Sequence, residues 1–151
     1  MSKPVLVTIF AALFSFVIAP QPAHAAPDDA CSLLTLSQIK SAAGTDPVAG
    51  KPSSANKVCT WNMASPSSNV KIITLMLQDP KMFNAGKNAP TPVTPVSGIG
   101  DDAYFMALGD MVSLFVKKGS ISFKIAVYAK LPVDQKEAME KALASQIVSQ
   151  L

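Results

Sequence analysis

The fold is decided by residues 103–130, which read AYFMALGDMVSLFVKKGSISFKIAVYAK. Three extended runs, 103–108, 111–117 and 120–130, are separated by the pairs Gly109-Asp110 and Lys118-Gly119. Such turn-prone pairs favour short hairpin loops between neighbouring strands. The stretch therefore predicts a meander of three antiparallel strands.

Side chains of two kinds alternate along the last of these runs, a period of two that is typical of a strand. We expect one face of this strand to be core and the other to be mixed. Two interpretations of the mixed face stay open: its lysines receive an anionic partner such as a glycan or a lipid headgroup, or they keep an exposed strand from aggregating. The core face carries Ile121, Phe123, Ile125, Val127 and Ala129, and the mixed face carries Ser122, Lys124, Tyr128 and Lys130.

Two further strands are predicted before the meander. Residues 57–63 place Cys59 and Trp61 on one face, which suggests a buried ring beside a cysteine. Residues 70–77 are largely apolar on both faces. This pattern predicts a central strand that is covered on both sides.

Helices are predicted at both ends of the chain. Thr35 with Gln38 forms a capping pair for a helix that ends at Gly44, and Asp134 with Glu137 forms another for a helix from about residue 133. Residues 79–87 favour a helical turn. The proline-rich segments 45–56 and 88–97 are interpreted as loops without regular strand pairing.

This order of elements predicts an α+β domain. We expect an antiparallel sheet of about five strands, packed by an N-terminal and a C-terminal helix. A PsbP-like sandwich would accommodate the order. The chain has no βαβ alternation and no internal repeat, which disfavours doubly wound and solenoid folds.

The N-terminus is typical of an export signal. Lys3 supplies the positive charge, residues 5–19 form an apolar run, and Ala23-His24-Ala25 places small residues at the positions that signal peptidase reads. Cleavage between Ala25 and Ala26 is expected. The chain then divides into a signal peptide, 1–25, and a single globular domain, 26–151. The mature protein is expected to be periplasmic or secreted and soluble, with no membrane span.

Removal of the signal also removes the one histidine, His24. All thirteen basic residues are lysines, and loss of Lys3 leaves twelve against ten acids. Catalytic triads that need an imidazole cannot be built from such a chain. Zinc sites are disfavoured because the mature chain has no histidine and only two cysteines. Recognition of nucleic acid is disfavoured because the chain has no arginine. We therefore expect no catalytic residue, no cofactor, no metal site and no nucleic-acid partner.

The two cysteines, Cys31 and Cys59, remain after cleavage. In an oxidising compartment an even number of thiols in a small domain normally pairs. We predict a Cys31–Cys59 disulfide, which would stabilise the domain by roughly 3.5 kcal/mol in the loop-entropy description.

Residues 98–102, GIGDD, are a candidate ligand loop, in which Gly98 and Gly100 precede the pair Asp101 and Asp102. Carboxylates next to flexible glycines can wrap a hard cation, but two adjacent ones supply too few ligands. We favour a turn that begins the next strand.

Several short motifs together resemble a broad group of exported bacterial domains of unknown function. They are CSLLT at 31–35, the helix end at Gly44, CTW at 59–61, GIGDDAY at 98–104 and KG at 118–119. Many members of that group are lipoproteins, whereas this chain has no lipobox before Cys31. The resemblance implies a fold and an exported location, and no catalytic residue.

Three functions remain open. The first is a non-catalytic binding or accessory module that contacts an envelope protein, a glycan or a small ligand through a sheet face or the loop at 87–97. The second is a small-molecule carrier with a pocket between the sheet and the terminal helix, lined by Met106, Tyr128 or Met139. The third, ranked last, is a glycan hydrolase that uses two of the carboxylates. Those carboxylates are Asp101, Asp102, Asp110 and Glu137.

Overall fold

The computed structural model describes residues 27–64 and 71–151 of the chain. The expected signal peptide, its cleavage point between Ala25 and Ala26, His24 and the first residue of the predicted strand 70–77 lie outside these residues. Within the described ranges, no helix has the length and apolar character needed to cross a membrane.

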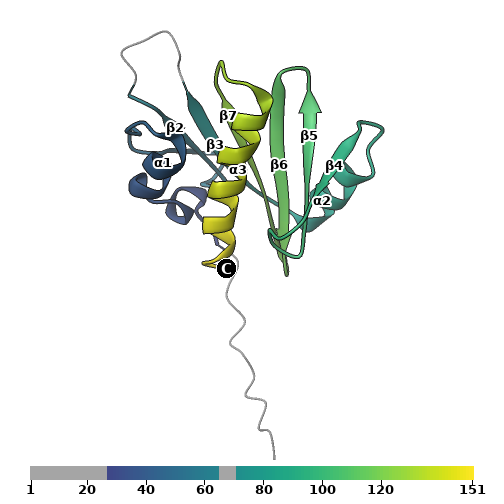
Figure 1. Cartoon of the computed structure of the whole chain (residues 1–151). Helices are drawn as coiled ribbons and strands as arrows, with labels where there is room; N and C mark the ends of the chain where they lie inside the picture. The colour runs from purple at the N-terminus through teal and green to yellow at the C-terminus, as the bar shows by residue number, and fades with distance from the viewer. Residues whose placement is uncertain (1–26, 65–70) are drawn as a thin grey trace, which may run out of the picture.

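Among the described residues, seven strands form one sheet (Figure 1). Their order across the sheet is β1-β2-β3-β7-β6-β5-β4, and all neighbouring strands run antiparallel. The α+β class and the antiparallel arrangement are thereby confirmed. The strands are β1 (Lys51–Ser53), β2 (Val58–Asn62), β3 (Ile72–Gln78), β4 (Val93–Val96), β5 (Asp102–Leu108), β6 (Met111–Lys118) and β7 (Ile121–Tyr128).

The predicted meander corresponds to β5, β6 and β7. Phe105 pairs with Leu114, and Leu114 pairs in turn with Ile125. Gly109 and Gly119 occupy the two hairpin turns with φ of 59° and 57°, a region that favours glycine. The turn chemistry and the alternation of side chains thus set the register together.

The strand number is higher than the five that we expected, because β1 and β4 lie in the segments interpreted as loops. Pro52 pairs with Cys59, and Pro95 pairs with Tyr104. Both proline-bearing strands are at the edges of the sheet. An edge strand needs only one row of backbone bonds, so a proline without an N–H can be accommodated there.

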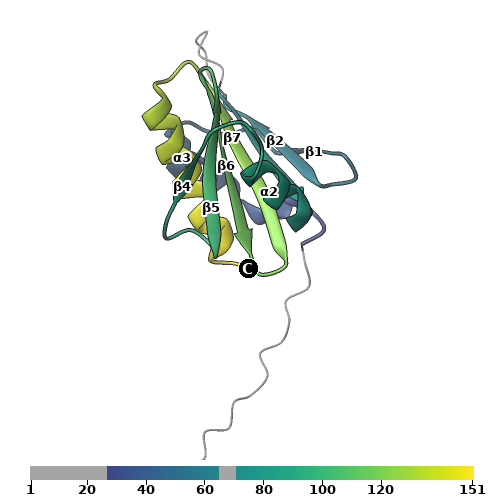
Figure 2. The same ribbon diagram turned by 90° about the vertical axis from the view of Figure 1, so that its right-hand side faces the viewer.

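Helices cover both faces of the sheet. The first face holds the 3₁₀ helix η1 (Ala30–Leu33), α1 (Leu36–Ala43) and α3 (Val133–Val148), whereas α2 (Pro80–Lys87) packs on the second face (Figure 2). The predicted turn at 79–87 is therefore the helix α2, with Asp79 as its N-cap.

The two predicted helix caps have different outcomes. The Thr35 hydroxyl accepts a bond from the Gln38 N–H at 3.3 Å, the Gln38 side chain accepts from the Thr35 N–H at 2.8 Å, and Gly44 ends the helix, which confirms the first cap. The predicted cap by Asp134 and Glu137 is wrong. Pro132 occupies the N-cap of α3 and no side chain caps the helix, because Asp134 already lies inside its first turn.

The main core lies between the sheet and the first-face helices. The predicted disulfide is present: Cys31 of η1 is bonded to Cys59 of β2, with their Cα atoms 5.0 Å apart. Trp61 packs beside it, and a side chain at Gly50 would lie 2.6 Å from both the Cys59 sulfur and the Trp61 ring. The largest members of this core are Trp61, Ile39, Ile73, Leu75, Leu114, Phe123, Ile125, Leu143 and Ile147.

β3 is central in the sheet, as expected, but it is not covered on both sides. Ile73 and Leu75 are fully buried toward the first face, whereas Ile72, Thr74 and Met76 are only half-buried. The reason is that α2 packs over a second aromatic cluster on β5 and β6, away from β3. Part of the second face is left open.

Candidate functional site

Residues 98–102 have a structural role, because Asp101 binds residues of the β6–β7 turn. Asp101 Oδ2 accepts a bond from the Gly119 N–H at 2.7 Å, and Asp101 Oδ1 lies 3.0 Å from Lys118 Nζ. Both hydrogen bonds lower the pKa of the Asp101 carboxyl below its ordinary value, and the bond from Gly119 has the larger effect. The segment therefore fastens the start of β5 to the β6–β7 turn.

Two glycines allow this segment to turn. Gly98 and Gly100 have φ of 82° and 64°, values that residues with a side chain rarely adopt. A side chain at Gly100 would also lie 2.5 Å from the carbonyl oxygen of Lys117. The glycine-and-aspartate pattern is thus explained by a turn, the interpretation that we favour.

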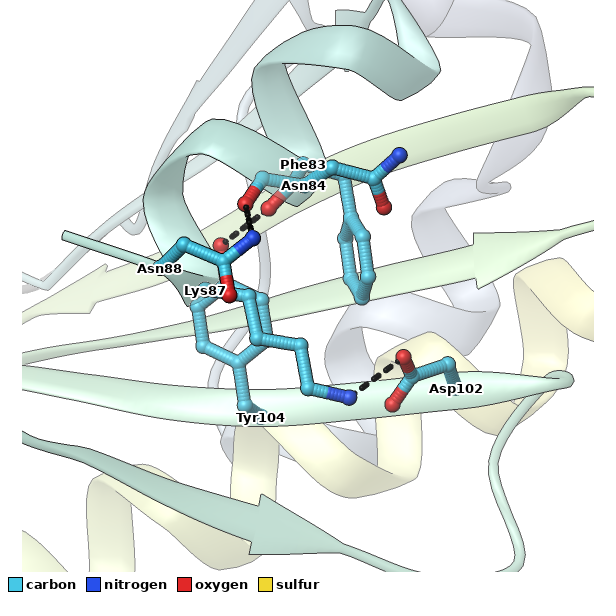
Figure 3. Close-up of polar contacts among 6 residues, drawn as sticks. All are labelled: Phe83, Asn84, Lys87, Asn88, Asp102 and Tyr104. Atoms are coloured by element: carbon cyan, nitrogen blue, oxygen red, sulfur yellow. Dashed lines mark hydrogen bonds and ion pairs between the residues drawn. The ribbon is translucent and has the colours of Figure 1, made fainter.

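Asp102 and its neighbours attach α2 to the second face (Figure 3). Asp102 Oδ2 lies 2.6 Å from Lys87 Nζ. The buried Tyr104 hydroxyl donates to the Phe83 carbonyl at 3.0 Å, and burial raises the pKa of that hydroxyl. The Tyr104 ring also packs between those of Phe83 and Phe115, with centroids 4.9 Å from each. Both aspartates of the candidate loop thus have structural partners.

Within residues 27–64 and 71–151, no group of three or more His, Cys, Asp or Glu side chains is placed to hold a metal ion.

A pocket of about 580 Å³ lies at one end of the sheet, between the end of β7 and the first turn of α3. It lies where the β5–β6 turn and the connection from β7 to α3 meet at one end of the molecule (Figure 1). We call it the end pocket. Its lining residues are Asp110, Met111, Val127, Tyr128, Ala129, Lys130, Leu131, Pro132 and Lys136.

A smaller hollow of about 70 Å³ adjoins the end pocket and shares Met111 and Tyr128 with it. We call it the side hollow, and the two together the Met111–Tyr128 groove. Lys124 lies in the side hollow with its Nζ atom 5.6 Å from the centre of the Phe115 ring, a cation–π distance. The side hollow is lined by Met106, Leu108, Met111, Ser113, Phe115, Lys124 and Tyr128.

Apolar side chains are unusually exposed around this groove. Leu108 is 59% exposed, Met111 54% and Tyr128 40%. Single exposed apolar residues are ordinary, but a contiguous group over a hollow is typical of an interaction site. The structure thus brings Lys124, Tyr128 and Lys130 of the predicted mixed face to one groove, and places Gly98, Gly100, Asp101 and Asp102 outside it.

Lys136 is one of the groove residues that the sequence analysis missed. Its side chain is 5% exposed, and Nζ donates to the Asp110 carbonyl at 2.7 Å. Among the described residues, no carboxylate forms an ion pair with Lys136 or with Lys130. A signal was available in the sequence: Lys136 lies at helical spacing from Leu143 and Ile147, on the buried stripe of α3.

Glu140, one turn after Lys136, was also missed. It is fully buried, its Oε1 accepts a bond from the Val127 N–H at 2.8 Å, and its Oε2 has no hydrogen-bond partner in the structure. Burial raises the pKa of this carboxyl to about 8, against the lowering effect of the backbone N–H groups of Val127, which donates to Oε1, and of Leu114. Glu140 does not line the groove.

The three residues expected to line a carrier pocket are not all together. Met106 and Tyr128 line the side hollow on the second face. Met139 packs against the main core on the first face. The end pocket nevertheless lies between the end of β7 and the first turn of α3, close to the place where a carrier pocket was expected.

Another pocket, of about 280 Å³, lies at the opposite end of β3 and β7, where its wall includes Gln78, Ser122 and Lys57. Pro27, the first described residue, also forms part of this wall, and we assign no ligand to the pocket.

Comparison of the chain with protein-family models, with curated proteins and with solved structures finds no match. The resemblance to exported bacterial domains and the PsbP-like topology therefore stay predictions.

Proposed function

We propose that the protein is an exported, non-catalytic binding module whose site is the Met111–Tyr128 groove. The observation that carries the proposal is the set of exposed apolar side chains around this groove. The volume of the end pocket, about 580 Å³, is within the range of roughly 300–1,000 Å³ that small-molecule sites have. The occupant that we favour is consequently a small ligand with an apolar body.

Two further observations support a binding role and an exported location. Both aspartates of the glycine-rich loop have structural partners, Lys118 for one and Lys87 for the other, which leaves them poorly placed for hydrolysis. The Cys31–Cys59 disulfide is compatible with an oxidising compartment, as expected for an exported chain.

The uncharged dye N-phenyl-1-naphthylamine is expected to bind the groove with a gain in fluorescence. Met111→Ser is expected to weaken this binding severalfold to about tenfold, because the dye would bury the exposed half of the Met111 side chain. Full burial of a methionine contributes about 1.5–3 kcal/mol, so half of it contributes about 0.8–1.5 kcal/mol, and 1.4 kcal/mol corresponds to a factor of ten. The measurement is a fluorescence titration of the protein expressed with its own leader and purified from the host.

Met82→Ser is the matched control for this titration. Met82 is 62% exposed on α2 and lines neither hollow of the groove. The M82S protein is expected to bind the dye like the wild type. No fluorescence gain in the wild type, or equal losses in M111S and M82S, would refute the groove as a binding site.

A further inference from the structure

We propose that the ligand of the Met111–Tyr128 groove is an amphiphilic anion, a free acid group on an apolar chain, and that Lys136 binds the acid group. This inference rests on the proposed function of the groove. It adds the chemical class of the ligand and assigns its charged end to one position of the pocket.

The position of the Lys136 ammonium is the first argument. Lys136 is only 5% exposed. Its ammonium group has one acceptor among the described residues, the neutral backbone carbonyl of Asp110. An ammonium group has three donors, so two more can be offered to a ligand in the pocket. A cation at the wall of a partly apolar pocket attracts an anion more strongly than one in open water.

The charges that line the end pocket are the second argument. Lys130 adds a second ammonium, and Asp110 contributes the one side-chain carboxylate of the lining. Among the described residues, Asp110 forms no ion pair with either lysine. The lining therefore has an excess of one positive charge, which a singly charged acid would neutralise.

The apolar walls are the third argument. Val127, Ala129, Leu131 and Pro132 line the end pocket together with the two lysines, and Met111 lines both this pocket and the side hollow. A small inorganic anion would leave these walls in contact with water. An anion with an apolar chain would cover them, and the exposed Leu108 in addition.

The burial of Lys136 also decides between two sources of this chemistry. A flat membrane surface could reach exposed lysines, but it could not reach an ammonium that is held inside a pocket wall. We therefore favour a free amphiphile, such as a medium-chain carboxylate, over an anionic lipid in a bilayer.

Decanoate and decanol form the matched ligand pair for the test, because they share a chain and differ in charge. Isothermal titration of the wild-type protein is expected to show at least tenfold tighter binding of decanoate. Lys136→Met is expected to remove this preference, so that decanoate binds no more tightly than decanol. Asp110→Asn is expected to strengthen decanoate binding, because it removes the competing carboxylate.

Lys141→Met is the control, since Lys141 lies on the same helix over the Phe105 ring and outside the groove. It is expected to preserve the preference for decanoate. Lys130→Met provides a second test at an exposed position, should K136M fail to fold, and is expected to weaken decanoate binding severalfold.

The outcomes separate this inference from the proposed function. Equal affinity of the wild type for decanoate and decanol would overturn the assignment of an anion and leave the groove a binding site. Absence of binding by both ligands would count against both proposals. Binding to anionic phosphatidylglycerol vesicles that K136M abolishes would overturn the choice of a free ligand.

Discussion

Replacement of Glu140 by glutamine is expected to flatten the pH dependence of stability between about pH 4.5 and 8. The wild-type carboxyl is buried, with its pKa raised from 4.5 to about 8, and its Oε1 accepts the Val127 N–H. Glutamine keeps an acceptor for that bond and cannot ionise. The E140Q protein therefore separates the effect of ionisation from the effect of packing.

The direction of the effect follows from where the proton is held. Between pH 4.5 and 8 the folded state keeps the proton on Glu140 and the unfolded state has lost it, so wild-type stability falls as the pH rises. The shift corresponds to roughly 3 to 5 kcal/mol across this window. The nearby Glu137 raises this pKa and Lys124 lowers it, both less than burial does.

The measurement is urea unfolding at pH 5, 6, 7 and 8, followed through the single tryptophan, Trp61, which is buried. The one histidine is His24, in the expected signal peptide, so no other side chain ordinarily titrates near pH 6.5. Glu137→Gln is the control and should leave the pH slope in place. Parallel curves for the wild type and E140Q would refute an uncharged Glu140 in the folded state.

Removal of the disulfide is expected to have the second large effect. Cys31 and Cys59 are 28 residues apart in the chain, and their bond ties η1 to the second strand beside Trp61. In the loop-entropy description such a closure stabilises the folded state by about 3 to 4 kcal/mol. The C31A/C59A protein should therefore unfold at a much lower urea concentration.

Dithiothreitol supplies an independent version of this experiment. The reduced wild type should unfold near the midpoint of C31A/C59A, and the double variant should not respond to the reductant. A wild-type midpoint that reduction leaves unchanged would show that the bond contributes nothing to stability.

Local patterns accounted for most of the architecture. The alternation at 121–129 and the glycine turns predicted the meander, and the Thr35 and Gln38 pair predicted the start of α1, because these signals act between residues close in the chain. The edge strands escaped prediction because Pro52 and Pro95 argue against pairing unless the position of a strand in the sheet is known.

The site was predictable only in part. Tyr128 follows from the face of β7, and Lys130 lies just after it, because the strand predicted over 120–130 ends at Tyr128. Lys136 joins them through the packing of α3 against the β5–β6 turn. A lysine on a helix is ordinarily solvent-exposed, so its sequence position alone indicates little. The spacing of Lys136, Glu140, Leu143 and Ile147 along one stripe was the available signal.

The most direct test of the groove is a ¹³C spectrum of the methionine methyl groups during titration with decanoate. Met111 is expected to shift most, followed by Met106, because both line the groove. No shift is expected for the signals of Met63 and Met139, which pack against the main core, or of the exposed Met82. Saturable shifts at Met111 that K136M weakens would support the account, whereas shifts confined to Met63, Met82 or Met139 would contradict it.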